Sequence, residues 1–103
     1  MNDSEFIQLA EPVFTRIQQG LENADLDFEL PADGILEIEF DNGSKLVVNR
    51  HNVAREIWVA ARSGGFHFRH DGSAWHDTRD GTELFAKLTA LIAAQGSVHA
   101  VFD

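Results

Sequence analysis

The sequence predicts an α+β fold in which two helices pack on one face of an antiparallel sheet of about six strands. Apolar residues recur at helical spacing near both ends of the chain, over residues 3–22 and 82–95. Between these segments, short stretches alternate apolar and polar residues, as half-buried strands do. Turn-forming pairs such as Asn42-Gly43, Gly64-Gly65 and Asp71-Gly72 separate the stretches. Because each element has one apolar side, we expect the second sheet face to remain open to solvent.

The first predicted helix covers residues 3–22, and the polar residues 2–4 supply its N-terminal cap. Pro12 lies inside this helix, where proline removes a backbone hydrogen bond and costs about 3 kcal/mol. We therefore expect either a kink near Gln8 or a break into two helical pieces. The apolar stripe consists of Phe6, Leu9, Ala10, Val13, Ile17 and Leu21, widened by Phe14.

Residues 25–40 are predicted to form a β-hairpin around the turn Pro31-Ala32-Asp33-Gly34. Apolar and acidic residues alternate in both arms, so the apolar residues of one arm must face those of the other on the core side. The register that meets this condition pairs Leu30 with Leu36, Phe28 with Ile38, Glu29 with Glu37, and Asp27 with Glu39.

This register sets like charges directly opposite each other on the exposed side of the hairpin, which destabilises a sheet. One interpretation is that solvent and salt screen the acidic face. The other is that the face binds a cation or a basic partner. Screening weakens the repulsion but gives no reason why the charges were collected, so we favour the second interpretation.

The remaining strands are predicted at residues 45–50, 56–62, 66–70 and 73–77. At the start of the first of them, Lys45 is expected to pair with Asp41 across the turn. In the second, Ile57 and Val59 are the natural core residues, so Trp58 is predicted to point outward. Either a long neighbouring side chain covers this indole, or it is an anchor for a protein partner, since Trp is enriched at binding hot spots.

The second predicted helix begins after residues 78–81, with Asp80 or Thr82 as its cap, and Gly96 ends it. Residues 98–102 are expected either to pair as an edge strand or to pack across the helices. The apolar stripe of this helix consists of Leu84, Phe85, Leu88, Leu91 and Ile92, extended by Gln95.

Composition narrows the classes of function. The chain has 103 residues, which predicts a single domain spanning residues 1–103. A net charge of −9 makes nucleic acid and anionic membranes poor partners and favours metal cations and basic proteins. The chain has no cysteine, which excludes disulfides, thiolate catalysis and Cys-ligated metal. No apolar run reaches membrane-spanning length, and we expect a cytoplasmic protein.

The polar residues show no recognisable catalytic set. The five histidines match no metal-ligand spacing, so we expect them to be surface residues without ligand function. No Ser/His/Asp arrangement and no phosphate-binding loop is visible either. The protein is therefore predicted not to be an enzyme.

Short motifs with one common resemblance run along the whole chain. They are Asn42-Gly43-Ser44-Lys45, Val48-Asn49-Arg50, Ile57-Trp58-Val59-Ala60 and Gly64-Gly65-Phe66-His67-Phe68, followed by Trp75, Asp77, Arg79, Gly81 and Leu84. Together with the opening Asn2-Asp3-Ser4-Glu5-Phe6, they make the sequence resemble the bacterial frataxins of the CyaY type. The resemblance implies a frataxin-like α-β sandwich and a role in iron–sulfur cluster assembly. It also implies weak binding of Fe²⁺ and Fe³⁺ and docking on the cysteine desulfurase and the scaffold machinery.

Site residues follow from the resemblance position by position. It implies an iron-binding ridge on the first helix and strand, which Asp3 and Glu5 extend. Gln18, Gln19 and Asn23 stand where such proteins usually carry acids, which reduces the number of carboxylates on the helix. The ridge consists of Glu11, Glu22, Asp25, Asp27 and Glu29. The expected partner-binding residues are Asp25, Asp27, Glu29, Glu37, Glu39, Asn49, Trp58 and His67.

Three functions remain open from the sequence. The first is an iron-binding regulator of cluster assembly, acting as iron sensor or iron donor. The second is a ferroxidase that stores iron in oligomers, although the helical Glu-x-x-His pattern of a di-iron site is missing. The third is an acidic interaction module without a metal role. We expect a monomer that can form oligomers when iron is present.

Overall fold

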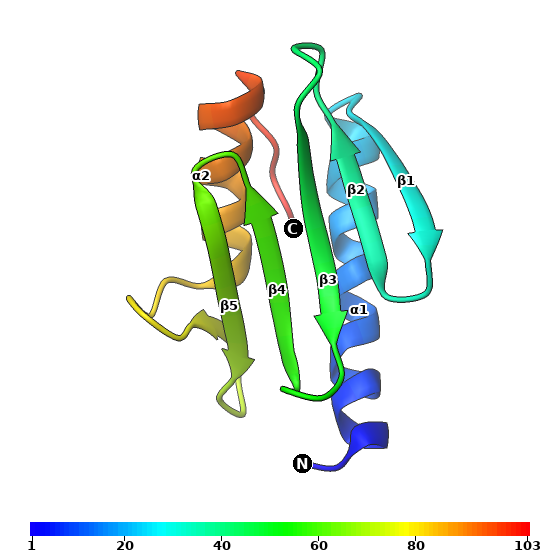
Figure 1. The fold of residues 1–103 in the computed structure, drawn as a ribbon, viewed down its shortest axis with the longest axis vertical. Coiled ribbons are helices and arrows are strands. Elements are labelled where there is room, and N and C mark those ends of the chain that lie inside the picture. The colour runs from blue at the N-terminus through cyan, green and yellow to red at the C-terminus, as the bar shows by residue number, and fades with distance from the viewer.

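The computed structural model describes residues 1–103 and has two layers, with both helices on one face of a six-stranded sheet (Figure 1). All neighbouring strands are antiparallel and follow the order β1-β2-β3-β4-β5-β6. The predicted fold class is confirmed. The helices are α1 (Asp3–Asn23) and α2 (Leu84–Gly96), and the strands are β1 (Asp27–Ala32), β2 (Ile35–Glu39), β3 (Lys45–His51), β4 (Glu56–Ala61), β5 (Gly64–His70) and β6 (Trp75–Asp77).

Helix α1 begins with a capping box. The Asn2 side chain accepts a hydrogen bond from the Glu5 amide at 2.9 Å, and the Glu5 carboxylate accepts one from the Asn2 amide. The helix continues unbroken through Pro12, so the alternative of two helical pieces is wrong. Pro12 and Gln8 are both exposed, and the carbonyl that loses its helical donor therefore lies on the solvent side of α1.

The β1–β2 hairpin has the predicted register over most of its length. Phe28 pairs with Ile38, Glu29 with Glu37 and Asp27 with Glu39. The predicted pairing of Leu30 with Leu36 is wrong, because the register shifts between Glu29 and Ala32. The cause is a two-residue turn at Asp33-Gly34, which pairs Ala32 with Ile35 and leaves one extra residue in β1. Leu30 is consequently 53% exposed, while Leu36 is fully buried.

Strands β2 to β6 form a regular ladder. Ile57 and Val59 are buried, as predicted, and so are Phe68 and Trp75 on the following strands. The expected pairing of Lys45 with Asp41 is wrong, because the β2–β3 register places Lys45 directly opposite Glu39. Lys45 therefore lies beside the acidic residues of the hairpin.

The cap of α2 also differs from the prediction. Glu83 is the N-cap, and its carboxylate accepts hydrogen bonds from the amides of Phe85 and Ala86 at 2.9 and 3.1 Å. Asp80 instead accepts from the Thr82 amide in the preceding turn. The helix includes Gly96 and is followed by Ser97 in the left-handed conformation.

The C-terminal tail packs across the helical layer and does not form a strand, which selects one of the two predicted arrangements. Phe102 is buried, and its carbonyl accepts hydrogen bonds from the Arg16 guanidinium of α1. The ring of Phe102 lies 6.0 Å from that of Phe85 in α2. The tail therefore links the two helices to each other.

Gly20 of α1 lies directly against the C-terminal tail. A Cβ atom at this position would lie 2.8 Å from the Val101 carbonyl oxygen and would overlap the Phe102 ring. Helix propensity alone favours Ala over Gly by about 1 kcal/mol. We expect the opposite for Gly20→Ala: a loss of about 1–3 kcal/mol in the free energy of unfolding, because overpacking displaces the tail. Urea denaturation measures this, with exposed Gln19→Ala as the neighbouring control, and a stabilised Gly20→Ala variant would contradict the packing.

Candidate functional site

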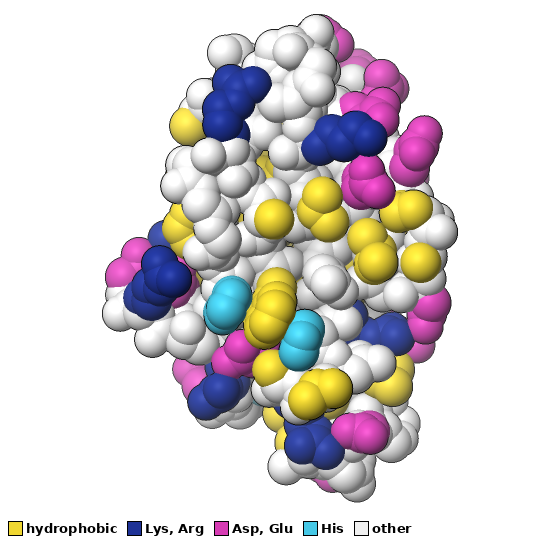
Figure 2. Space-filling model, viewed as in Figure 1, with side chains coloured by type: hydrophobic (Ala, Val, Ile, Leu, Met, Phe, Trp, Pro, Cys, Tyr) yellow, Lys and Arg dark blue, Asp and Glu magenta, His cyan; other side chains and the backbone are white.

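The open face of the sheet carries two groups of polar side chains (Figure 2). Acidic side chains with one cation among them collect toward the β1–β2 edge, and two histidines flank a hydrophobic side chain near the centre. Both groups project from strands because alternate residues of a strand point to opposite faces, and the helices occupy the other face (Figure 1).

The acidic strip, defined here as Asp27, Glu29, Glu37 and Glu39, has the predicted arrangement of carboxylates facing each other across β1 and β2. Lys45 on β3 partly neutralises it, since its Nζ lies 3.4 Å from Glu37 Oε1 and 3.6 Å from Glu39 Oε1. The hydrogen bond that Lys45 donates to Glu37, followed by the negative charges of Glu37 and Glu39, raises the pKa of Lys45 above its ordinary value. Asp27 and Glu29 form no ion pair within the chain. The β1 half of the strip is therefore the half without a counter-charge.

The remaining ridge residues do not gather at one point. Glu22 ends α1, and Asp25, in the left-handed conformation, follows it in the turn to β1; both are exposed and lead into the strip. Glu11 lies three helical turns earlier, about 16 Å away along the axis at 1.5 Å per residue. In no part of the chain do three or more His, Asp or Glu side chains converge as metal ligands.

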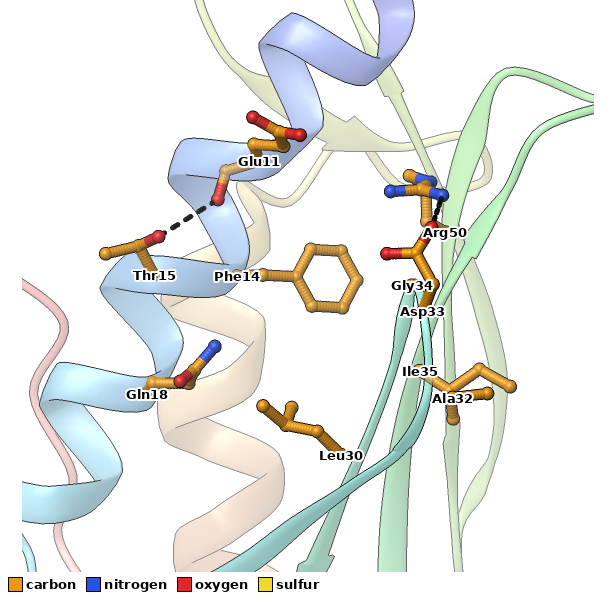
Figure 3. A pocket seen from close by; sticks show the side chains of 10 residues that line it. All are labelled: Glu11, Phe14, Thr15, Gln18, Leu30, Ala32, Asp33, Gly34, Ile35 and Arg50. Atoms are coloured by element: carbon orange, nitrogen blue, oxygen red, sulfur yellow. Dashed lines mark hydrogen bonds and ion pairs between the residues drawn. The ribbon is translucent and has the colours of Figure 1, made fainter.

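Glu11 instead borders a cavity of about 490 Å³ between α1 and the β1–β2 turn (Figure 3). Its hydrophobic lining residues are Phe14, Leu30, Ala32 and Ile35, and the exposed position of Leu30 follows from the bulge in β1. The Arg50 guanidinium at the rim is paired with Asp33 at 2.9 Å. The Thr15 hydroxyl donates a hydrogen bond to the Glu11 carbonyl one helical turn earlier.

The second group is an aromatic stack, defined as His51, Trp58 and His67. The Trp58 ring lies between the two imidazoles, with centroid distances of 3.7 Å to His51 and 4.3 Å to His67 and interplanar angles of 13° and 8°. The cross-strand register explains the contact with His67, since Trp58 pairs with Asn49 on one side and with His67 on the other. The prediction that Trp58 points outward is confirmed.

The buried carboxylate of Glu56 forms a hydrogen bond with the central ring of the stack. Glu56 is only 5% exposed although it lies on the open face, and its Oε1 accepts the indole N–H of Trp58 at 2.9 Å. The Arg69 guanidinium donates to its Oε2 at 2.6 Å, and His67 Nδ1 lies 3.8 Å from Oε1. On the other side, His51 Nδ1 accepts the Ala54 amide hydrogen at 3.1 Å, which fixes that ring.

Sequence reasoning missed Glu56, Arg69 and His51 as parts of this site. Alternation along a strand places Glu56 on the same face as Trp58, and Arg69 on the same face as His67. The face on which both residues lie could therefore be predicted from the sequence. The sequence does not reveal which residues of β3, β4 and β5 become lateral neighbours. His51 also lies just outside the predicted strand 45–50, whereas the structure shows it to be the last residue of β3.

Removing the central ring should destabilise this side of the sheet. We expect Trp58→Ala to lower the free energy of unfolding by about 1–2 kcal/mol, since it abolishes two ring contacts and leaves Glu56 with one donor fewer. Trp58→Phe keeps a ring between the imidazoles and should lose less. Urea unfolding followed by circular dichroism compares them, and equal losses would show that stacking contributes nothing.

No helix of the structure is both long enough and apolar enough to cross a bilayer.

Comparisons with known proteins agree with the fold and the motifs. The family model described as "Frataxin-like domain" matches residues 1–98. The iron-sulfur cluster assembly protein CyaY of Dechloromonas aromatica is 60% identical over 97 residues, covering 92% of each chain. The protein of the same name from Janthinobacterium sp. is 48% identical and covers all of this chain and 97% of its own length. The structure of a frataxin from Psychromonas ingrahamii superposes with a TM-score of 0.92 at 34% identity, covering 100% of this chain and 99% of that one. The chain therefore belongs to the bacterial frataxin family, of the CyaY type.

Proposed function

We propose that this protein is a cytoplasmic iron-binding regulator of iron–sulfur cluster assembly that docks on the cysteine desulfurase. It acts by binding and not by turnover, as an iron sensor or an iron donor. The names of its relatives support the assembly role. The observation that carries the proposal is the acidic strip, whose β1 carboxylates, Asp27 and Glu29, face two carboxylates of β2 and form no ion pair within the chain.

The carboxylates suit iron that is carried and exchanged. Iron as a hard cation takes oxygen ligands, and those of Glu22, Asp25, Asp27 and Glu29 follow one another from the end of α1 along β1. All four side chains are exposed, and no buried groups orient them, so affinity should be weak and the ions exchangeable. Glu11 lies apart and would hold iron independently of this set.

The same strip suits a basic protein surface. A row of carboxylates accelerates association with an Arg- and Lys-rich patch and fixes its register, and both effects weaken with salt. Iron bound at Asp27 and Glu29 would neutralise part of the surface that the desulfurase contacts. Competition of this kind would make docking depend on the iron concentration.

An anaerobic titration tests the proposal. Fe²⁺ is added to the isotope-labelled protein, amide signals are followed by NMR, and the titration is repeated with the desulfurase present. We expect the strongest broadening at residues 22–29 and a weaker effect at Glu11. The variant Asp25→Asn/Asp27→Asn/Glu29→Gln should lose the response, whereas Asp41→Asn/Asp103→Asn should keep it.

Two other outcomes of this titration would each indicate one of the alternative functions, a ferroxidase or an acidic interaction module. Oxygen consumption with repeated iron turnover would show a ferroxidase. Desulfurase binding with no amide response to iron would show an acidic interaction module. The absence of three converging ligands favours the module over a ferroxidase, because oxidation at a fixed centre needs several protein ligands that hold the iron together while leaving positions open for oxygen.

A further inference from the structure

We propose that the cavity between α1 and the β1–β2 turn binds a free α-amino acid with an apolar side chain (Figure 3). The ion pair of Arg50 with Asp33 receives the carboxylate and the ammonium group, and Phe14 and Leu30 receive the side chain. None of these residues belongs to the acidic strip, so the site does not depend on the proposed function. The volume of about 490 Å³ lies in the range of roughly 300–1,000 Å³ that is usual for small-molecule sites.

Arg50 at the rim of the cavity is a fixed cation with unused hydrogen-bond donors. Its side chain is only 11% exposed and lies against the turn, where a Cβ atom at Gly34 would be 3.3 Å from the Arg50 Cζ. Nε donates to Asn52 at 3.0 Å and Nη2 donates to Asp33 at 2.9 Å, whereas the Nη1 donors have no partner in the chain. A guanidinium held in this way suits a carboxylate, which it can bind through two parallel hydrogen bonds.

The acidic groups beside Arg50 suit an ammonium group. Only the Oδ2 atom of Asp33 contacts Arg50, and its Oδ1 atom accepts no hydrogen bond in the chain. Glu11 borders the same cavity from α1 and forms no ion pair. The cavity therefore presents a cation with free donors next to a carboxylate with a free acceptor.

The balance of charge favours a zwitterion over a simple ion. A plain carboxylate would contact Arg50 but would also meet Asp33 and Glu11, in a protein whose net charge is −9. A plain amine would be attracted by both acids and repelled by Arg50. An α-amino acid carries its carboxylate and its ammonium group on one carbon atom, so each group can meet the opposite charge of the Arg50–Asp33 pair. Both contacts are then charge-assisted hydrogen bonds.

The apolar wall determines which amino acids fit. Figure 3 shows Phe14 pointing from α1 toward the strands and Leu30 pointing from β1 toward α1. Leu30 is 53% exposed, because the bulge in β1 leaves it outside the core. A ligand side chain that covers part of this surface removes apolar area from water, which favours binding. We therefore expect leucine and phenylalanine to bind more tightly than alanine and glycine.

A series of related ligands tests the recognition of the head group and the side chain. L-leucine, N-acetyl-L-leucine, L-leucinamide and glycine are each titrated into the isotope-labelled protein at constant pH, and amide signals are followed by NMR. We expect saturable shifts around the cavity with L-leucine. The other three compounds should bind about tenfold more weakly or less, because they lack the ammonium group, the carboxylate and the apolar side chain respectively.

Two pairs of variants test the residues. Asp33→Asn removes the charge that attracts the ammonium group, at a side chain that is 89% exposed, and should bind leucine about tenfold more weakly. Asp41→Asn makes the same change in another exposed turn and should bind as wild type. Leu30→Ser removes apolar wall and should reduce the preference for leucine over glycine several-fold. Val53→Ser, at a position that is 91% exposed, should leave this preference unchanged.

Several results would overturn the proposal. L-leucine that produces no saturable shift up to its solubility limit would show that the cavity binds no such ligand. Equal affinity for N-acetyl-L-leucine would indicate a site for carboxylates, and equal affinity for L-leucinamide a site for amines. Leucine binding that Asp33→Asn leaves unchanged would place the ligand elsewhere on the molecule.

Discussion

Replacing Asp27 and Glu29 together by lysine should weaken binding to the cysteine desulfurase at least tenfold, or about 1.4 kcal/mol. The only strip residues that pair with Lys45 are Glu37 and Glu39, so the carboxylates of Asp27 and Glu29 are free to attract a basic partner. The two lysines of the variant would instead repel that partner. Affinity is measured at several salt concentrations, and the wild type should show the steeper dependence.

The same double variant should fold at least as stably as the wild type. Lysine at position 27 would lie opposite Glu39, and lysine at position 29 opposite Glu37, so two repulsive cross-strand pairs become attractive. Such pairs contribute about 0.2–1 kcal/mol each. A loss of binding with a gain in stability distinguishes a docking surface from a structural role.

The control for charge is Asp41→Lys with Asp103→Lys. It changes the net charge by the same amount at exposed positions outside the strip that form no ion pair. If this control loses as much affinity as the strip variant, overall charge and not the strip attracts the partner. If neither variant loses affinity, the docking surface lies elsewhere.

Phe6→Ala should lower the free energy of unfolding by about 3–5 kcal/mol. Phe6 near the start of α1 is fully buried and meets Trp75 of β6 edge-to-face, with centroids 5.9 Å apart at 71°. The pair connects the first helix to the last strand, so truncation leaves a cavity where the two layers meet. The free energy of unfolding of a whole protein is roughly 5–15 kcal/mol, so this loss would be a large part of the stability.

Leu9→Ala on the same helix is the matched control. Leu9 is 37% exposed, and its truncation should cost less than about 1 kcal/mol in the same urea titrations. Comparable losses for the two variants would mean that the Phe6–Trp75 contact does not connect the layers as the structure indicates.

The elements were predictable because their signals are local. Apolar spacing located both helices and the core residues Ile57 and Val59, and the alternation of β1 and β2 predicted the pairing of Glu29 with Glu37. The prediction failed where a turn length decides the register. Two turn residues at Asp33-Gly34 produced the bulge that exposes Leu30, and the β2–β3 turn set Lys45 opposite Glu39.

The site was predictable only in part, for the same physical reason. Alternation indicates the face on which a side chain lies, so the outward position of Trp58 could be predicted. It says nothing about which residues on neighbouring strands become lateral neighbours. The stack with His51 and the hydrogen bond from Trp58 to Glu56 depend on that register.

The different environments of the two tryptophans allow intrinsic fluorescence to report on binding and on unfolding. The chain has no tyrosine, so its ultraviolet emission comes from Trp58 and Trp75 alone. Trp75 is enclosed in the interior, whereas Trp58 lies between imidazoles at the surface. Partner binding at the open face should therefore shift the emission of one fluorophore and global denaturation that of both, which lets a spectrometer tell the two events apart without a label.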